Sequence, residues 1–459
     1  GDVYKRQLQG SHPPVGSVYP SMNNLPPEGA SPGRVRWRIL AILVVLSFIA
    51  YVLRMSLSVA GDSMMRDLGI SQVQLGMAFA AFAWAYALAQ FPGGVLGDVL
   101  GPRRVLTWIA VCWTVVSVAT GLIPGGRGEG INLALTCLIA LQALVGLVQA
   151  PLFPTMAGSI RAWFPTGGWA YPTGLTSGGL TLGAAASSPL IAWLVVSFGW
   201  RLAFILTAPL GLLAALLWWR TSRDDPAEHP DVGAAELAFI NRGREPTHEE
   251  PPGAWKLVLR DRNVLLLTLS YFCMNYVFYM FFHWFFIYLV QVREFQALEG
   301  GFLATAPWIV GAFGAIAGGA WCDRVCKSRG MRFGTRQPAL ICLPLVAVLL
   351  WAGAGAPDPY KAVVMLSLCF GCTQLTEGAY WAAMTAVAGR HTSAAAGVLN
   401  TGGNAVGGFG ALLVPILAEH FGWIVALSSG SVMALIAAIL WLFIRADEPL
   451  EVPRRPSAA

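Results

Sequence analysis

Residues 37–60 read WRILAILVVLSFIAYVLRMSLSVA and are apolar for about 20 residues. At roughly 1.5 Å per residue, a helix of this length crosses a hydrocarbon core of about 30 Å. Its interior nevertheless carries Arg54, one turn after Tyr51. A guanidinium in hydrocarbon costs roughly 2.5–3.5 kcal/mol on the most lenient scale, and arginine stays charged. We therefore expect Arg54 to face a polar cavity or an anionic partner.

The composition predicts a polytopic membrane protein. Of the 459 residues, 56% are hydrophobic and only 12% are charged, whereas a soluble domain has about 25% charged residues. No enzyme motif and no metal motif is found, and the eight cysteines lack the partners that a metal site or disulfide framework would need. We expect a protein that is not an enzyme and has no cofactor.

Twelve apolar segments are long enough to span the bilayer as helices. The fold expected is an all-α membrane protein with two pseudo-symmetric six-helix bundles. The segments are 38–60, 73–97, 104–124, 131–157, 170–197, 200–219, 263–290, 300–320, 338–356, 360–387, 393–418 and 422–443.

The domain boundaries follow from the polar segments between these spans. Residues 2–7 read DVYKRQ, which matches a translated sequencing adaptor; we interpret them as an artefact, with the native start at or near Met22. The predicted parts are a disordered segment 1–36, a first bundle 37–219, a cytoplasmic linker 220–262, a second bundle 263–443 and a cytoplasmic tail 444–459.

The distribution of lysine and arginine predicts the orientation. With both termini inside, 22 of these residues fall in cytoplasmic segments and five fall outside: Arg66, Arg127, Arg201, Arg293 and Lys361. We expect the protein to be a monomer that crosses the cell membrane several times. The formal charge of +6 is then a positive-inside signature, and nucleic-acid binding is not expected.

An internal repeat relates the two halves. GVLGDVLGPRR at 94–104 and GAWCDR at 319–324 both contain Gly-x-x-x-Asp followed by basic residues, 225 residues apart. In the first copy we predict an ion-pair gate at the cytoplasmic end, and the alternative is that these charges only set the topology. Its residues are Gly94, Asp98, Arg103, Arg104 and Arg161.

These features resemble the major facilitator superfamily. The loop at 94–104 is similar to the signature loop between its second and third helices, with Val99 where an arginine is more usual. Within it, the closer resemblance is to the anion:cation symporter family, which carries sugar acids and other organic anions. The matching stretches are Tyr51-x-x-Arg54 and residues 82–94, 151–165, 225–240 and 400–404.

This sequence departs from that family at the positions that often couple transport to the movement of protons. Members often have an aspartate just before the arginine of the first helix, where this chain has Leu53. They often have an arginine and a glutamate seven residues apart in the fourth helix, where this chain has Gln142 and Gln149. The resemblance thus implies transport of an organic anion without the usual coupling carboxylate.

We predict a substrate site around Arg54, whose guanidinium fork suits a carboxylate. The alternative is an arginine paired with a structural carboxylate or a helix end. Further polar and aromatic residues are expected to line the same cavity, or else to form interhelical hydrogen bonds. They are Tyr51, Tyr86, Gln90, Tyr276, Tyr279, Trp381, Asn400 and Asn404.

Two other ionisable residues lie deep in predicted spans. Glu377 is three residues beyond the repeat position of Gln149, so it is a candidate for the displaced coupling carboxylate; it could instead pair with Arg54 or be structural. His283 is a candidate for proton handling or substrate binding, with a neutral, hydrogen-bonded histidine as the alternative.

The sequence therefore predicts a secondary active transporter that moves a sugar acid or another small carboxylate by alternating access. Symport with a proton or sodium ion is expected. The alternatives are a uniporter or exchanger of an aromatic or other carboxylate, and a receptor or sensor that retains the transporter fold.

Overall fold

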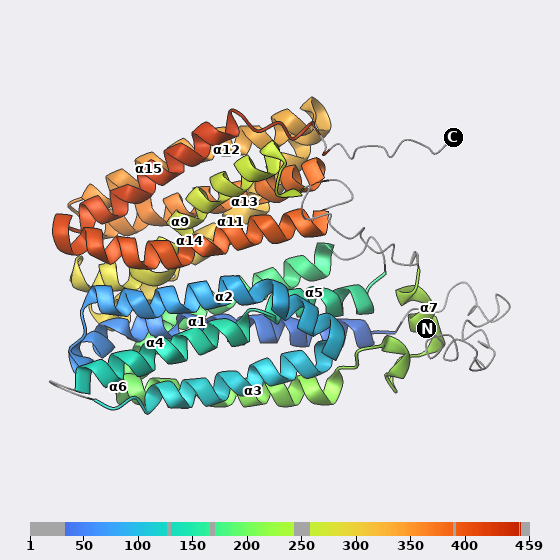
Figure 1. Cartoon of the computed structure of the whole chain (residues 1–459), viewed down its shortest axis with the longest axis horizontal. Coiled ribbons are helices and arrows are strands. Elements are labelled where there is room, and N and C mark those ends of the chain that lie inside the picture. Colours follow the sequence, from blue (N-terminus) through green and yellow to red (C-terminus); the bar gives the residue numbers. More distant parts are fainter. Residues whose placement is uncertain are drawn as a thin grey trace, which may run out of the picture.

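The computed structural model describes residues 33–125, 130–165, 170–242, 258–388, 392–448 and 450, and these are helical with no strand. The interpretations of residues 2–7 and Met22 and the predictions for Arg127 and most of the tail concern positions outside the described residues. Figure 1 shows the first six-helix half packed against the second. The first half contains α1 (Val35–Leu68), α2 (Gln72–Leu100), α3 (Pro102–Gly121), α4 (Gly130–Gln149), α5 (Leu152–Trp163) and α6 (Ala170–Thr221).

The second half repeats this order after a short connecting region. That region contains η2 (Pro226–Glu228) and α7 (Ala234–Ile240). The second half contains α9 (Arg262–Gln291), α10 (Ala297–Leu303), α11 (Ala306–Arg329), α12 (Met331–Gly355), α13 (Pro359–Ala388), α14 (Thr392–Phe421) and α15 (Trp423–Trp441).

The predicted fold class is confirmed. Eleven helical segments of the described chain are long and apolar enough to cross a membrane. One of them, in α6, holds two spans, because Gly199 has a φ of 79° and interrupts the helix where the spans at 170–197 and 200–219 were predicted to meet. The described chain therefore contains twelve spans, two of which, α4–α5 and α10–α11, are each formed by two consecutive helices.

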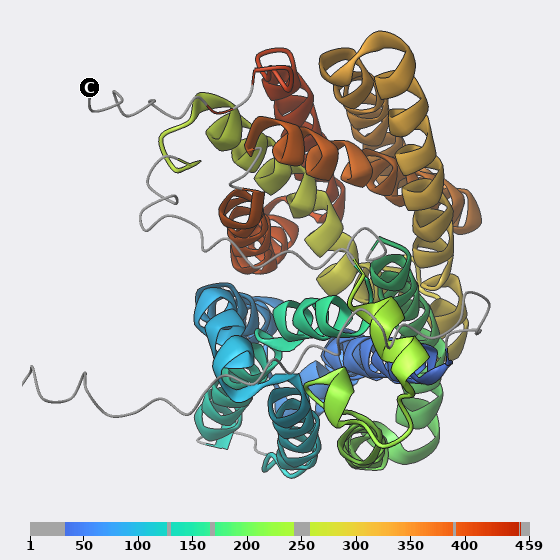
Figure 2. The ribbon, with the colours of Figure 1, turned by 90° about the vertical axis from the view of Figure 1, so that its right-hand side faces the viewer.

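The two halves meet through four helix pairs: α2–α14, α1–α9, α6–α10 and α6–α11. Figure 2, viewed from the end that carries α7, shows them as two separate groups of helices. At the opposite end, small residues bring the halves together: a Cβ on Gly76 would lie 2.5 Å from the carbonyl oxygen of Ala411, and one on Gly301 would lie 3.0 Å from that of Ser188. Only glycine allows backbones to approach this closely.

Polar side chains also join the halves at that end. Gln291 of α9 donates to a carboxylate oxygen of Asp62 in α1 at 2.7 Å, and Gln72 of α2 donates to Gln291 at 2.6 Å. Asp62 also pairs with Arg66, one turn further along α1. This end of the interface is closed by hydrogen bonds as well as by packing.

The connecting region is folded onto the first half. This packing was not predicted from the sequence. Glu236 of α7 accepts hydrogen bonds from the backbone N–H groups of Val35 and Arg36 and from the Arg36 side chain. Because Glu236 is only 1% exposed, this is a buried cap on the first turn of α1. The N-terminal end of α1 therefore lies beside α7.

Candidate functional site

The guanidinium of Arg54 lies among aromatic rings in the middle of α1. Its central carbon is 4.7 Å from the ring centroids of both Phe82 and Tyr86 of α2, 5.0 Å from that of Phe282 and 5.4 Å from that of Tyr51. Each such contact attracts the cation through the negative face of the ring. The charge is thus stabilised by neutral side chains from both halves.

No ion pair of Arg54 is found among the described residues. Its recorded hydrogen bond is to the hydroxyl oxygen of Tyr279 at 3.4 Å, and its Nε atom is buried with no partner. A cation that is desolvated but not neutralised attracts an anion strongly. The arrangement leaves guanidinium donors available to an anionic ligand.

A chain of hydrogen bonds continues from Arg54 across the interface. Tyr279 donates to the side-chain oxygen of Asn404 at 2.6 Å, and Asn404 donates to the side-chain oxygen of Asn400 at 3.1 Å. Asn400 in turn donates to Gln90 of α2 at 3.2 Å. Five of the predicted site residues therefore form one network that starts and ends in the first half.

Glu377 lies within the second half and bonds residues other than Arg54. Its carboxylate accepts hydrogen bonds from the hydroxyl of Tyr271 at 2.7 Å and from the indole N–H of Trp381 at 2.8 Å. Tyr271 is joined to Asn275, which donates to its carbonyl oxygen at 2.9 Å. The predicted pair Glu377–Arg54 does not occur in this conformation, and Trp381 contacts the carboxylate.

His283 is 1% exposed and lies between two rings on the path from Arg54 to the closed end. It stacks on Phe79 at 4.5 Å and on Tyr279 at 5.5 Å. Neither ring nitrogen has a partner, and its carbonyl oxygen accepts a hydrogen bond from Ser58 at 2.7 Å. An unpaired buried imidazole is costly, so a ligand or water that bonded it would be favoured.

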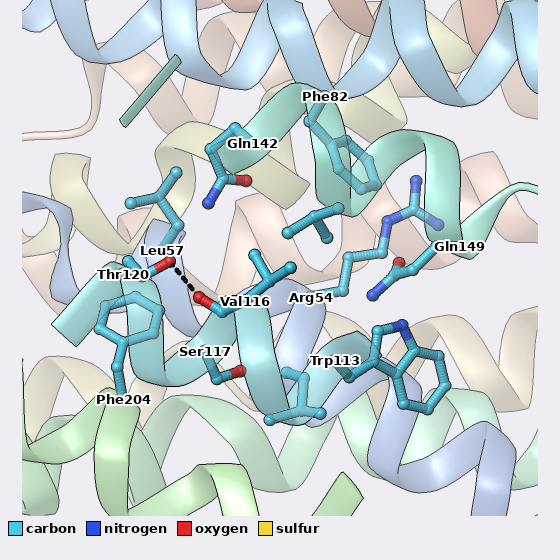
Figure 3. Close-up of a pocket in the computed structure, with 12 residues that line it drawn as sticks. Arg54, Leu57, Phe82, Trp113, Val116, Ser117, Thr120, Gln142, Gln149 and Phe204 are labelled. Carbon is cyan, nitrogen blue, oxygen red and sulfur yellow. Dashed lines mark hydrogen bonds between the residues drawn. The ribbon is translucent and has the colours of Figure 1, made fainter. Parts of the chain in front are cut away.

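A cavity of about 30 Å³ lies inside the first half beside Arg54 (Figure 3). Its lining includes Gln142 and Gln149 of α4 and Trp113 of α3. Gln149 and Trp113 each have a buried N–H group without a partner. The cavity is large enough for about one water molecule. Its lining among the described residues contains no carboxylate, so the first half offers no acid to accompany Arg54 there.

Tyr276 lies outside the group around Arg54. Its hydroxyl is 2.9 Å from that of Ser429 in α15, so it faces the interior of the second half. Conversely, the sequence reading missed Phe82, Phe282 and Tyr271. Tyr271, Asn275 and Tyr279 follow one another at intervals of four positions, which puts all three on one face of α9, and that spacing was the available signal.

The predicted gate residues lie at the end that carries α7. Arg103 donates to the carbonyl oxygen of Trp219 through two side-chain nitrogens, at 2.9 and 3.2 Å, and its backbone N–H donates to Asp224 at 2.7 Å. Gly94 packs against Pro154, while Arg104 and Arg161 are exposed. The side chain of Asp98 falls outside the description, so the gate itself stays a prediction.

The described residues contain no group of three or more His, Cys, Asp or Glu side chains suited to a metal ion. The group around Arg54 consists of that one arginine, an array of amides and hydroxyls, and aromatic rings. This is a set suited to holding a polar anion by charge and hydrogen bonds rather than to bond-making chemistry.

Comparison with known proteins identifies the family. The model of the Major Facilitator Superfamily matches residues 43–386 and 329–459. The chain belongs to the Major Facilitator Superfamily. The superfamily consists of transporters, which confirms the expectation that the protein is not an enzyme. As a member of this superfamily, the chain is an integral membrane protein.

The relatives narrow the resemblance within the superfamily. The chain is 32% identical to the "Probable galactarate/D-glucarate transporter" of Bacillus subtilis over 73% of this chain and 75% of the relative. It is 29% identical to the D-galactonate transporter of Escherichia coli, over 92% of this chain and 99% of that transporter. The predicted resemblance to sugar-acid and organic-anion permeases is confirmed by these relatives.

A solved structure supports the fold. The chain superposes on a bacterial homologue of the human lysosomal transporter Spinster, solved in an inward-facing and unoccupied conformation, with a TM-score of 0.74. The match covers 90% of this chain and 98% of that one at 16% identity. This similarity establishes the major facilitator fold of the chain.

Proposed function

We propose that the protein is a secondary active transporter of an organic anion, with a sugar acid or another small carboxylate as substrate. One observation carries the proposal: Arg54 is half-buried at mid-membrane between the two halves, with its Nε atom buried and no ion pair among the described residues. A bound carboxylate would neutralise this charge through the guanidinium fork.

The network beside Arg54 suits the remainder of a sugar acid. Gln90, Asn400 and Asn404 offer amide donors and acceptors, and Tyr279 offers a hydroxyl. Hydroxyl groups of a substrate can exchange with these hydrogen bonds at little net cost. The relatives named for galactarate, D-glucarate and D-galactonate support this substrate class.

Alternating access is the proposed mechanism. The contacts that join the halves include the hydrogen bonds Asp62–Gln291 and Gln72–Gln291 and the close packing of Gly76 on Ala411, all at one end. Rocking of the halves about the site would break these contacts and form others at the end that carries α7. We propose that the α7 end, with both termini, is cytoplasmic and that the monomer is the working unit in the cell membrane.

Coupling to an ion is proposed to involve Glu377. It is the acid in the described part of α13 and is held by Tyr271 and Trp381. Its protonation would change the charge of the second half without touching Arg54. We propose proton symport on this basis; sodium symport, uniport and exchange remain outcomes of the tests below.

Counterflow in proteoliposomes tests the function directly. Vesicles loaded with unlabelled D-galactonate, D-glucarate or a hexuronate should take up the labelled anion, whereas a receptor with the transporter fold would not exchange it. Arg54→Ala and Arg54→Lys should both abolish exchange, because neither restores a bidentate donor. Arg38→Ala is the matched control, since Arg38 lies on the same helix with its side chain 57% exposed and away from the closed end of the interface. Normal exchange by Arg54→Ala at equal reconstitution would refute the proposal.

A further inference from the structure

A second cavity lies far from Arg54, where α11 ends and α12 begins. It has a volume of about 340 Å³, and its lining includes three arginines, Arg329, Arg332 and Arg336, with Asp447. This volume falls in the range of small-ligand sites, roughly 300–1,000 Å³. Three cations and one anion therefore face the same space.

The internal repeat shows what occupies the equivalent place in the first half. There Gly101, with φ of 82°, turns the chain into α3, and Asp224 caps that helix by accepting from the backbone N–H of Arg103 at 2.7 Å. A Cβ on Gly101 would lie 2.5 Å from a carboxylate oxygen of Asp224. The carboxylate fills the position at the start of this helix.

In the second half the same elements leave that position open. Gly330, with φ of 84°, turns the chain into α12. In the described chain no hydrogen bond joins the first N–H groups of α12 to a side chain, whereas at α3 the N–H of Arg103 bonds Asp224. Asp447 follows α15 as Asp224 follows α6, but its carboxylate oxygen is 3.7 Å from Nε of Arg332. Asp447 thus forms an ion pair with Arg332, but it does not cap the helix, so the positive end of the helix dipole is not neutralised.

Two of the arginines that line the cavity are held in place by contacts with the protein. Arg336 donates to the carbonyl oxygen of Ile444 at 2.6 Å, while its Nε atom is buried without a partner. Arg329 lies over the ring of Phe333 at 5.2 Å. Guanidinium groups and helix N-terminal amides together form the usual binding surface for phosphate.

The position of the cavity suggests where the phosphate comes from. Met331 and Phe333 at its rim are 39% and 45% exposed, and further along α12 the apolar residues Ile341 and Val348 are also exposed. An acyl chain can lie along this exposed apolar side of α12. Basic pockets between membrane helices bind anionic headgroups in this way.

We propose that this cavity binds a phosphate group, supplied by the headgroup of an anionic phospholipid in the surrounding leaflet. The lipid phosphate would take the place at α12 that Asp224 takes at α3, and it would join α11, α12 and the segment after α15.

Native mass spectrometry of the full-length protein tests the proposal, with phosphatidylglycerol and phosphatidylcholine offered in equal amounts. Wild type should retain phosphatidylglycerol preferentially, and Arg332→Gln/Arg336→Gln should lose at least tenfold of that preference. Arg38→Gln is the control, because Arg38 forms an exposed pair with Asp231 at the same end of the molecule. An unchanged preference in the double variant would overturn the site.

Two further experiments test whether misfolding explains the loss of lipid and whether the bound phosphate belongs to a lipid. Asp447→Asn removes the competing carboxylate, so it should increase retention of phosphatidylglycerol, a gain that misfolding cannot produce; unchanged or weaker retention counts against the site. Inorganic phosphate at ~10 mM should displace little lipid from wild type. If phosphate displaces the lipid fully, or raises the melting temperature of lipid-free protein as much as phosphatidylglycerol does, the lipid assignment is overturned.

Discussion

Arg54 and Tyr279 occupy the same position in the two repeats, 225 residues apart, and meet across the interface, with Nη2 3.4 Å from the phenolic oxygen. Ser58 and His283 are likewise 225 residues apart and bonded through the His283 carbonyl oxygen. Helices α1 and α9 therefore cross where the pseudo-two-fold axis passes. At that crossing the first repeat supplies a cation and the second a neutral hydroxyl, and this asymmetry would give a bound anion a single orientation under the proposed function.

We expect Tyr279→Phe to raise the KM for the anion about tenfold. The hydroxyl bonds both Arg54 and Asn404, and a hydrogen bond to a charged group contributes about 1.5–3 kcal/mol, where 1.4 kcal/mol is tenfold. Initial rates of uptake over a range of substrate concentrations measure the change. Tyr276→Phe is the control, because its recorded hydrogen bond is to Ser429; equal effects of the two substitutions would contradict the assigned role.

We expect Glu377→Gln to retain counterflow and to lose accumulation driven by a proton gradient. Glutamine keeps an oxygen acceptor for Tyr271 and Trp381, so both hydrogen bonds survive while the ionisable group is removed. The measurement compares exchange with uphill uptake in the same proteoliposomes under an imposed pH gradient. Continued uphill uptake by the variant would show that coupling lies elsewhere, and a sodium gradient tests the other ion.

We expect Gly76→Ala to destabilise the closed end of the interface by roughly 1–3 kcal/mol, the usual effect of overpacking. The added Cβ would lie 2.5 Å from the carbonyl oxygen of Ala411, which belongs to rigid backbone. Gly178→Ala is the matched control, since nothing lies within 4 Å of its Cβ position. Apparent melting temperatures in one detergent compare them, and equal values would mean that α2 and α14 are less tightly packed than described.

We expect Glu236→Ala to destabilise the protein by roughly 3–5 kcal/mol, because it leaves Arg36 and the first turn of α1 buried without their acceptor. Asp231→Ala breaks the exposed pair with Arg38, with side chains 55% and 57% exposed, so its effect should stay well under ~1 kcal/mol. Thermal unfolding of both variants provides the comparison. A similar loss of stability in both variants would show that the buried cap is not the cause of the loss.

The spans could be predicted from sequence because length and apolarity are local properties. Even the break at Gly199 fell between two predicted spans. The buried pair Arg36–Glu236 could not be predicted, since its members are 200 residues apart and α7 is a seven-residue helix in a polar segment. Its contact depends on the assembled bundle.

The candidate site was predictable in part for the same reason. Arg54 is conspicuous as a charge in an apolar run. Tyr276 and Tyr279 were both predicted to line the cavity, yet three residues turn a helix by about 300°, and the two side chains meet different neighbours. Phe82 and Phe282 could not be selected, because aromatic residues are common throughout membrane helices.

The aromatic surroundings of Arg54 have a consequence for competition. Where an arginine is paired with a carboxylate, the substrate and that carboxylate are rivals, and acid favours the substrate by protonating its rival. Phe82 and Phe282 have no ionisable group, so an anion arriving at Arg54 displaces no charged competitor. Loading of the empty carrier should therefore vary little with pH, and acidity should instead govern the return of the carrier through Glu377.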